Sequence, residues 1–345
     1  MGRKDTVTKE YVRENAVFAD AFNFFLYNGE PVLDPAGLTE LDTTELVVPF
    51  SDDEAKDELQ TEAVQKYRDI LKSATIMRDD CASYVILGIE NQSHIHYAMP
   101  VRNQIYDALQ YGKQVADLAG RHRAEKNERQ GDDRDRQPTK DEFLSGVHRD
   151  DRLTPVITLV IHFGASEWDG PLSLKEMMVV SDETILSYIQ DYKVNLIDPS
   201  QITESDMNKF HSSLREVFNF IRYSTDGAKL KEYLESESRL QNLEVRAARV
   251  IKTITNSKFE IPEGAEVIDM CKAEEELMME SKNEGLSQGL SQGLAQGREE
   301  QAQATAIRMS QKGCTIEDIS DFIGYQIDVV RGWLELADCH GAVTP

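Results

Sequence analysis

Two strand-like segments separated by a two-residue turn signal constrain the fold of this chain more than any other feature. Residues 66–78 (KYRDILKSATIMR) and 82–92 (ASYVILGIENQ) are rich in β-branched and aromatic side chains and meet at Asp79-Asp80. If these two aspartates are the central residues of a hairpin turn, the resulting register places Asp69 directly opposite Glu90. Directly opposite residues project from the same face of a sheet, with Cβ atoms about 5 Å apart. The sequence therefore predicts two neighbouring carboxylates.

Gln92 shares the face of Glu90, because side chains along a strand alternate with a period of two. Two adjacent carboxylates repel each other unless they share a cation or a proton. Hard oxygen ligands favour Mg²⁺ or Mn²⁺ over zinc. A register shift of one residue would put Asp69 and Glu90 on opposite faces and remove the predicted site.

The rest of the chain alternates regular segments with charged ones. Regular structure is predicted for helices over 10–27 and 101–120, a buried strand over 156–163, and helices over 204–223 and 228–254. Two charged stretches interrupt this pattern. Residues 28–62 are expected to be an irregular surface excursion, and residues 121–152 a solvated, mobile loop.

The sequence resembles the Rpn family of recombination-promoting nucleases, within the PD-(D/E)xK superfamily. The resemblance is carried by RDIL (68–71), LGIENQ (87–92), YAMPVRNQIYDALQY (97–111) and PVITLVIHFG (155–164). Asp69, Glu90 and Gln92 match the acid, acid and lysine positions of the superfamily motif, with glutamine in place of lysine. The resemblance implies an α/β fold, namely a restriction-endonuclease-like mixed sheet flanked by helices, over residues 1–200.

This resemblance implies a Mg²⁺- or Mn²⁺-dependent DNA endonuclease, with the metal held by Asp69 and Glu90. The superfamily often adds an acid from the first helix, for which Asp20, with Glu14 behind it, is the candidate; a solvated acid without a metal role is the alternative for Asp20. Arg102 and Tyr106, on the helix that follows the site, could contact phosphate or serve in structural packing. Little sequence specificity is expected, because no base-reading element stands out. Gln92 can orient a water but brings no positive charge. Two alternatives therefore stay open: a catalytically weak or inactive DNA- or protein-binding module, and a defence or toxin nuclease.

A net charge of −24 argues against binding to nucleic acid, whose phosphates attract Lys and Arg. The charge is unevenly distributed, however. Residues 28–62 contain eleven acids and one base, and residues 260–300 contain eleven acids and three bases. Residues 63–115, which include the predicted site, contain five acids and six bases. The argument against DNA is therefore weakened but not removed.

Beyond the nuclease core, we expect a helical region over 201–280 and a helical tail over 281–345. The tail contains the repeat GLSQ-GLSQ-GLAQ-G, with a glycine at every fourth position from Gly285 to Gly297. This pattern predicts a helical spacer or stalk through which the chain forms a homo-oligomer. Residues 315–334 resemble a small helix-turn-helix element that docks on a partner or on the chain itself. Its inward side chains are expected to be Ile316, Ile319, Ile323, Val329 and Trp333.

The cysteines are scattered, with no CxxC pair, which favours a reducing compartment and predicts a cytoplasmic protein. They are Cys81, Cys271, Cys314 and Cys339. The longest apolar runs are far shorter than the roughly 20 residues that span a bilayer, so no membrane association is expected. His94 and His96 form an HxH pair that leaves a transition-metal site open, although no third ligand has a useful spacing. His162 lies within an apolar run and is expected to be a core histidine.

Overall fold

A mixed five-stranded sheet forms the centre of the fold. The computed structural model describes residues 3–47, 64–67, 69–78, 81–128 and 138–341. The strand order is β1-β4-β5-β6-β7, with antiparallel pairing from β1 to β5 and parallel pairing from β5 to β7. The bounds are Thr39–Glu40 (β1), Ile70–Arg78 (β4), Cys81–Gln92 (β5), Val156–His162 (β6) and Asn195–Ile197 (β7). The predicted mixed α/β sheet flanked by helices is confirmed.

Helices precede, interrupt and follow the sheet in sequence. Those before and between the strands are Arg3–Val12 (α1), Asn15–Tyr27 (α2), Met99–Glu128 (α3), Lys140–Ser145 (α4) and Glu183–Ser187 (α5). Those after it are Glu204–Met207 (α6), Leu214–Tyr223 (α7), Gly227–Ser236 (α8) and Val245–Thr255 (α9). Two antiparallel pairs stand apart from the main sheet: Thr44–Val47 (β2) with Val64–Tyr67 (β3), and Leu243–Glu244 (β8) with Val267–Ile268 (β9).

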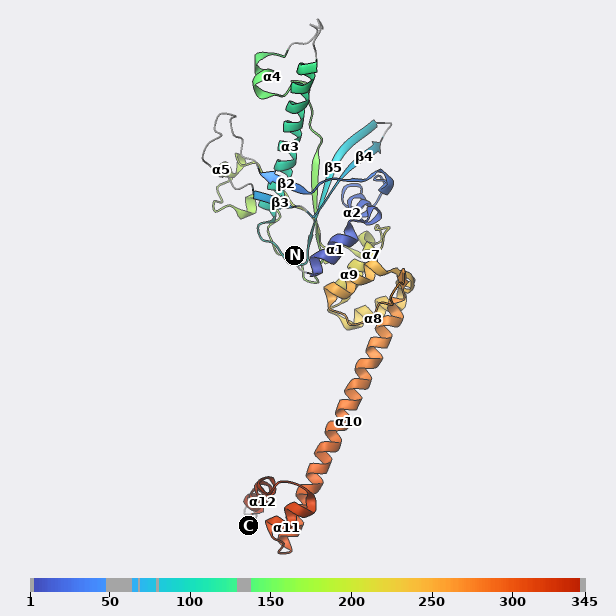
Figure 1. Ribbon diagram of the computed structural model, residues 1–345, viewed down its shortest axis with the longest axis vertical. Helices are drawn as coiled ribbons and strands as arrows, with labels where there is room; N and C mark the ends of the chain where they lie inside the picture. The colour runs from blue at the N-terminus through green and yellow to red at the C-terminus, as the bar shows by residue number, and fades with distance from the viewer. Residues whose placement is uncertain (1–2, 48–63, 68, 79–80, 129–137, 342–345) are drawn as a thin grey trace. The chain divides into compact units, whose positions relative to one another are not determined.

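The two faces of the sheet differ in chemistry, as the alternation along β5 shows. Val85, Leu87 and Ile89 point into the main hydrophobic core, which also contains Phe18 and Phe22 of α2. The intervening residues of β5 project from the opposite face, on which α3 lies. Figure 1 shows α3 on one side of β4 and β5 and α2 on the other.

Polar contacts attach α3 to the sheet. The buried carboxylate of Asp107 accepts hydrogen bonds from Thr158 Oγ1 at 2.5 Å and from Tyr192 Oη at 2.6 Å. Two turns further along α3, the Gln114 side-chain amide forms hydrogen bonds with both the N–H and the carbonyl oxygen of Thr154. The polar stripe of α3 is therefore used for docking, which fixes the helix along β6.

The predicted helix over 10–27 is two helices, α1 and α2, with a break at residues 13–14. The buried Lys72 of β4 is the physical reason. Its Nζ donates hydrogen bonds to the carbonyl oxygen of Arg13 and to Oδ1 of Asn15. The predicted stop is confirmed, since Asn28 ends α2 in the left-handed conformation (φ 56°).

The two charged stretches contain more regular structure than expected. α3 continues to Glu128, and α4 occupies 140–145 with a Thr139–Glu142 capping box, so helix replaces loop over these parts of 121–152. Residues 28–47 include β1 and β2. Residues 48–63 and 129–137 lie outside the described residues.

The predicted helices over 204–223 and 228–254 are each interrupted. The first comprises α6 and α7, and the second comprises α8 and α9 with a 3₁₀ turn and β8 between them. Val217 of α7 and Val250 of α9 belong to the same core cluster as Ile70 of β4 and Leu159 of β6. The chain divides into the compact units Met1–Ala273 and Glu274–Pro345, so most of the region 201–280 lies in the first unit.

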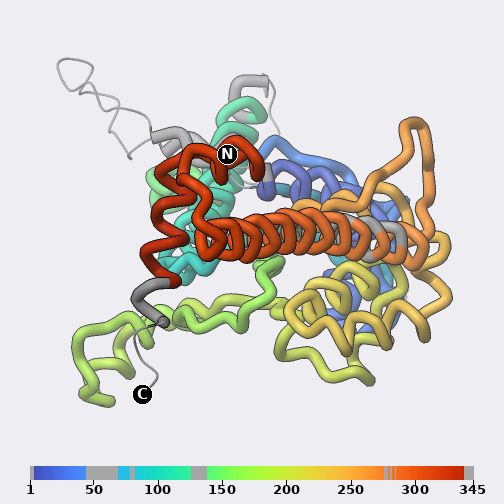
Figure 2. The backbone as a smooth tube through the Cα atoms, turned by 90° about the horizontal axis from the view of Figure 1, so that it is seen from below, coloured from blue at the N-terminus to red at the C-terminus, as the bar shows by residue number. Residues whose placement is uncertain are grey.

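The second unit is helical. Figures 1 and 2 show Met270–Gln311 (α10) as a single helix that leads into Ile316–Ile323 (α11) and Ile327–Gly341 (α12). Its small core is formed by Ala306, Ile319, Val330 and Trp333. The prediction that Val329 faces inward is wrong by one residue, since Val330 is buried and Val329 is 40% exposed. Among the described residues, no helix combines the length and apolar character needed to cross a membrane.

Candidate functional site

The β4–β5 register brings Asp69 and Glu90 together. Ile70 pairs with Ile89 and Arg78 with Cys81, which is the register predicted from the turn, although Asp79 and Asp80 themselves lie outside the described residues. The next position places Asp69 opposite Glu90. The Asp69 N–H donates to Glu90 Oε1 at 3.3 Å, and the Asn91 N–H donates to Asp69 Oδ2 at 3.0 Å. Main-chain groups therefore hold both carboxylates at the end of the hairpin.

Both carboxylates are largely withdrawn from solvent. The Glu90 side chain is fully buried, and that of Asp69 is 13% exposed. Burial raises the pKa of Asp69, against the lowering effects of the Asn91 amide, Lys9 and Arg102. A carboxylate in this position gains from any additional positive charge that reaches it.

Two basic side chains approach the acidic pair from different helices. Arg102 of α3 lies 2.9 Å from Glu90 Oε2 through its Nη2 atom, and Lys9 Nζ of α1 lies 4.0 Å from Asp69 Oδ1. Among the described residues, a basic side chain therefore approaches each of the two carboxylates. Sequence reasoning anticipated Arg102 but missed Lys9, which comes from a helix about 60 residues upstream in the chain and has no motif to mark it.

Tyr106 orients Arg102. The Arg102 Nε donates to the Tyr106 hydroxyl at 3.2 Å, and the guanidinium lies 5.6 Å from the ring centroid. Burial alone would lower the pKa of Arg102, but Glu90 and Tyr106 raise it above its usual value. Arg102 stays protonated, and its side chain is 31% exposed, so it can also meet a ligand from solvent.

Gln92 lies on the same face as Glu90, at the last position of β5 and beside His162 of β6. Its carbonyl oxygen accepts a hydrogen bond from the Phe163 N–H at 2.8 Å, and its side chain is partly exposed. The expectation for His162 is confirmed. It is 1% exposed, and its Nε2 lies 2.9 Å from the Ser166 carbonyl oxygen, as in a core histidine with a hydrogen-bond partner.

Asp20, the predicted additional metal ligand, is engaged elsewhere. Its carboxylate accepts hydrogen bonds from the main-chain N–H groups of His211 and Ser212 and from the Ser212 hydroxyl. These bonds fix the loop before α7 to α2, so we assign Asp20 a structural role. Glu14 is likewise paired with Arg246. The acid that α1 brings near Asp69 is Asp5, whose charge raises the pKa of Asp69.

The donor set of this cluster suits a small divalent cation. Mg²⁺ is commonly bound through one or two carboxylates together with water and substrate phosphates. Asp69 and Glu90 supply two such carboxylates, and Gln92 lies at the same end of β5. The structural observation that favours an added cation is the burial of the Asp69 carboxylate, whose cost the Asn91 N–H, Lys9 and Arg102 offset only in part. Arg102 and Lys9 provide positive charge in the protein as it stands.

The HxH pair has a simpler environment. In the described part of the chain, one group of three side chains has metal-ligating atoms close enough to share an ion, namely His122, His148 and Asp151. His94 and His96 are not part of this group. Among the described residues, therefore, no third ligand joins the two histidines.

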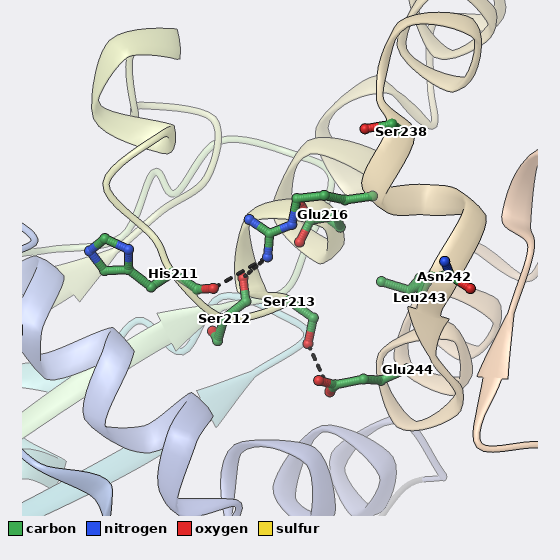
Figure 3. A pocket seen from close by; sticks show the side chains of 9 residues that line it. His211, Ser212, Ser213, Glu216, Ser238, Asn242, Leu243 and Glu244 are labelled. Carbon is green, nitrogen blue, oxygen red and sulfur yellow. Dashed lines mark hydrogen bonds and ion pairs between the residues drawn. The ribbon is translucent and has the colours of Figure 1, made fainter.

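A polar pocket of about 370 Å³ lies between the loop 211–213 and residues 238–244 (Figure 3). Its charged groups already have partners. Arg239 Nη2 donates to the carbonyl oxygens of His211 and Ser212, and the buried Glu216 pairs with Arg239 and Arg215. The polar side chains of the pocket therefore serve to join α7 and the loop before it to the segment before α9, which is a structural role.

Comparison with known proteins finds one matching family model. Residues 141–248 match the family model described as "Putative transposase, YhgA-like", which belongs to the Rpn/PD-(D/E)xK-like group, and the resemblance seen in the sequence is confirmed. The matched stretch runs from α4 into α9 and does not include Asp69, Glu90 or Gln92. No curated protein and no solved structure matches the chain.

Proposed function

We propose that this chain, whose residues 141–248 match the model of a YhgA-like putative transposase family, is a metal-dependent DNA endonuclease of the PD-(D/E)xK type. The observation that carries the proposal is the Asp69–Glu90 juxtaposition at the end of the β4–β5 hairpin. The description of the matched family model, a putative transposase, points to DNA as the substrate, and a pair of buried acids between two cationic side chains suits phosphodiester hydrolysis. Little sequence specificity is expected.

Asp69 and Glu90 would hold Mg²⁺ or Mn²⁺, with Gln92 beside them. When bound, the ion would supply an activated water and stabilise the charge that develops on the scissile phosphate. Arg102 is the group best placed to contact that phosphate, because it is bound to Glu90 yet partly exposed. Tyr106 acts through Arg102 as a positioning residue, since its hydroxyl accepts the Arg102 Nε–H.

Lys9 offers a charge that Gln92 lacks. The superfamily motif normally carries a lysine at the position of Gln92, where its charge offsets the negative transition state. The Lys9 ammonium approaches Asp69 Oδ1 to 4.0 Å from α1, so it can supply this charge from outside the motif. We therefore include Lys9 among the candidate catalytic residues.

Three arginines lie at the rim of a cavity beside α1. The cavity, of about 370 Å³, is bordered by Arg13, Arg246 and Arg249 together with Glu10, and Arg13 and Arg246 are paired with Glu40 and Glu14. Arginine side chains at such a rim suit phosphate contacts, which fix the register of a duplex without reading its sequence.

The second candidate function is a DNA- or protein-binding module of the same fold without catalysis. Gln92 in place of lysine favours it, as does the Arg102–Glu90 ion pair, which a metal ion would have to rearrange. A nuclease used in defence or as a toxin would share the chemistry of the first candidate and differ only in biological use.

Plasmid nicking separates these candidates. Purified protein is incubated with supercoiled DNA and Mg²⁺ or Mn²⁺, alongside Asp69→Asn and Glu90→Gln, which keep side-chain size, and Glu232→Gln, an exposed acid on α8, as the matched control. We expect metal-dependent nicking by the wild type and the control and at least a hundredfold loss in both site variants. DNA binding without nicking by the wild type would favour the binding module.

A further inference from the structure

A second group of ligating side chains lies far from the acidic pair. His122 of α3 faces the turn that contains His148 and Asp151, and one donor atom of each residue lies within 4.8 Å of the donors of the other two. Roughly twenty helical residues separate His122 from Arg102, which corresponds to about 30 Å along α3. The group is therefore independent of the proposed nuclease site.

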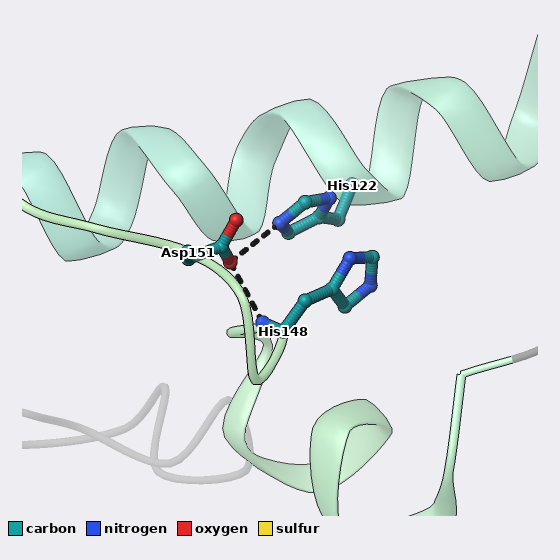
Figure 4. Close-up of side chains that lie close together, drawn as sticks. All are labelled: His122, His148 and Asp151. Carbon is teal, nitrogen blue, oxygen red and sulfur yellow. Dashed lines mark hydrogen bonds and ion pairs between the residues drawn. The ribbon is translucent and has the colours of Figure 1, made fainter.

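His122 and Asp151 are in direct side-chain contact, and His148 is held beside them through its main chain and its ring. His122 Nε2 lies 2.8 Å from Asp151 Oδ2, and the same oxygen accepts the His148 N–H at 2.7 Å. The two imidazole rings stack with centroids 3.6 Å apart and an angle of 27° between their planes. Figure 4 shows the rings lying against each other, with the Asp151 carboxylate facing the edge of the His122 ring. All three side chains are partly buried, so water can still reach the group.

The turn that carries two of these residues is held in place independently. Gly146 adopts a left-handed conformation (φ 71°) and packs so closely that a Cβ there would lie 2.9 Å from Ala119 Cβ of α3. On the other side of the turn, the Thr154 N–H and carbonyl are both bonded to Gln114 of α3. Contacts at both ends therefore fix the separation between His122 and the other two ligands before any ion arrives.

We propose that His122, His148 and Asp151 bind a zinc-type divalent transition-metal ion that clamps the turn 146–154 onto α3. Two imidazoles and one carboxylate are a ligand set that suits Zn²⁺, Co²⁺ and Ni²⁺ better than Mg²⁺. In a tetrahedral zinc site, neighbouring donors lie about 3.3 Å apart, so the 2.8 Å contact between His122 and Asp151 must widen slightly. The two stacked rings must also tilt apart, so that one nitrogen of each faces the ion. A water would complete the coordination.

Metal binding by the full-length, untagged chain tests this proposal. After treatment with a chelator, the protein is titrated calorimetrically with Zn²⁺, and Co²⁺ binding is followed by visible absorption. We expect one tight Zn²⁺ or Co²⁺ site per chain, a tetrahedral-type Co²⁺ spectrum, and a higher melting temperature with Zn²⁺. Mg²⁺ should not compete for this site.

The key variant is His148→Phe, which keeps a ring to stack on His122 but removes the ligand nitrogens. This variant and Asp151→Asn should each lose at least tenfold in Zn²⁺ affinity while remaining folded by circular dichroism. His94→Ala/His96→Ala is the matched control and should bind as the wild type does. Absence of a tight site in the wild type, or unchanged binding by both His148→Phe and Asp151→Asn, would overturn the proposal.

The outcome does not depend on the nuclease proposal. Asp69→Asn/Glu90→Gln should retain the Zn²⁺ site, and His148→Phe should retain any Mn²⁺-dependent nicking. A protein that nicks DNA but binds no Zn²⁺ contradicts only this inference, and a protein that binds Zn²⁺ but does not nick contradicts only the proposed function.

Discussion

At the scale of single residues, the acidic pair is shaped by a conflict between burial and charge. The Glu90 side chain is fully buried and that of Asp69 is 13% exposed, and a basic side chain approaches each carboxylate. Arg102 and Lys9 balance the formal charge, but burial still raises the pKa of Asp69. In its ionised form, the Asp69 carboxyl group therefore destabilises the fold. A loss of stability at a binding residue is the expected trade-off between stability and function.

Asp69→Asn should therefore stabilise the protein while abolishing Mn²⁺ binding at the pair. Since the folded pKa of Asp69 is raised above its unfolded value, the stability it contributes is present below the unfolded pKa of about 4 and is lost as pH rises through the folded pKa. At pH 7 we expect a gain of about 1 kcal/mol in the free energy of unfolding. Urea unfolding measures it, and the gain should disappear below about pH 4. A less stable variant at pH 7 would contradict this account.

Arg102→Ala should have the opposite effect on stability. It removes the guanidinium that lies 2.9 Å from the buried Glu90 carboxylate, and removing one member of a buried pair costs about 3 kcal/mol. Adding Mn²⁺ should recover part of this loss in the variant, because the ion replaces the missing charge. Thermal melting with and without Mn²⁺ provides the measurement. Equal stability of the variant and the wild type would show that the Arg102–Glu90 pair is energetically unimportant.

At the scale of elements, α4 shows how a short helix is held by its first turn. Glu142 accepts hydrogen bonds from the main-chain N–H groups of Thr139 and Arg149, and these bonds lower the pKa of its carboxyl group to about 2. The same side chain thus closes the capping box and attaches the turn after α4. Arg149 lies between His148 and Asp151 in the sequence, so this link reaches the turn that contains both residues.

The Glu142 link should be sensitive to acid. Because the folded pKa is depressed, its stabilising effect is present above the unfolded pKa of about 4.5 and is lost as pH falls towards about 2. We expect the amide resonances of Thr139 and Arg149 to shift together with the Glu142 carboxyl in an NMR titration. In Glu142→Gln these shifts should be absent at all pH values. Independent titration of the two amides in the wild type would contradict the link.

At the scale of the whole molecule, the glycine repeat of α10 lacks a packing partner among the described residues. A Cβ added at Gly285, Gly289, Gly293 or Gly297 would meet no atom within 4 Å. The leucines that follow the first three of these glycines are 56–67% exposed: Leu286, Leu290 and Leu294. An apolar stripe beside small residues on an exposed helix is suited to packing against another copy of the same helix.

Deleting residues 285–345 should therefore lower the oligomeric state and leave metal binding by Asp69 and Glu90 unchanged. Light scattering gives the mass, and calorimetric titration with Mn²⁺ gives the binding. Replacing Leu286, Leu290 and Leu294 together by glutamine is the matched variant, since it keeps the helix and removes only the apolar stripe. An unchanged mass in both proteins would exclude the stalk.

The sequence alone determined the parts of this protein that depend on local patterns. The alternation in 82–92 and the turn signal between the strands were enough to predict the register that brings Asp69 opposite Glu90. Four segments between residues 68 and 164 carry the family resemblance, and this resemblance in turn implied the sheet flanked by helices. These features were accessible because strand period and hairpin register are fixed by residues close in sequence.

Only the tertiary structure decided which distant side chains complete each site. The sequence made Asp20 the candidate for a metal-binding acid from the first helix, but its carboxylate accepts hydrogen bonds from the loop before α7. The residues of α1 that approach Asp69 are Lys9 and Asp5. The break between α1 and α2 required Lys72 of a strand about 60 residues away. His122 met His148 and Asp151 only because α3 is long and the turn docks on it. Contacts of this kind arise from the packing of whole elements, and no spacing along the chain encodes them.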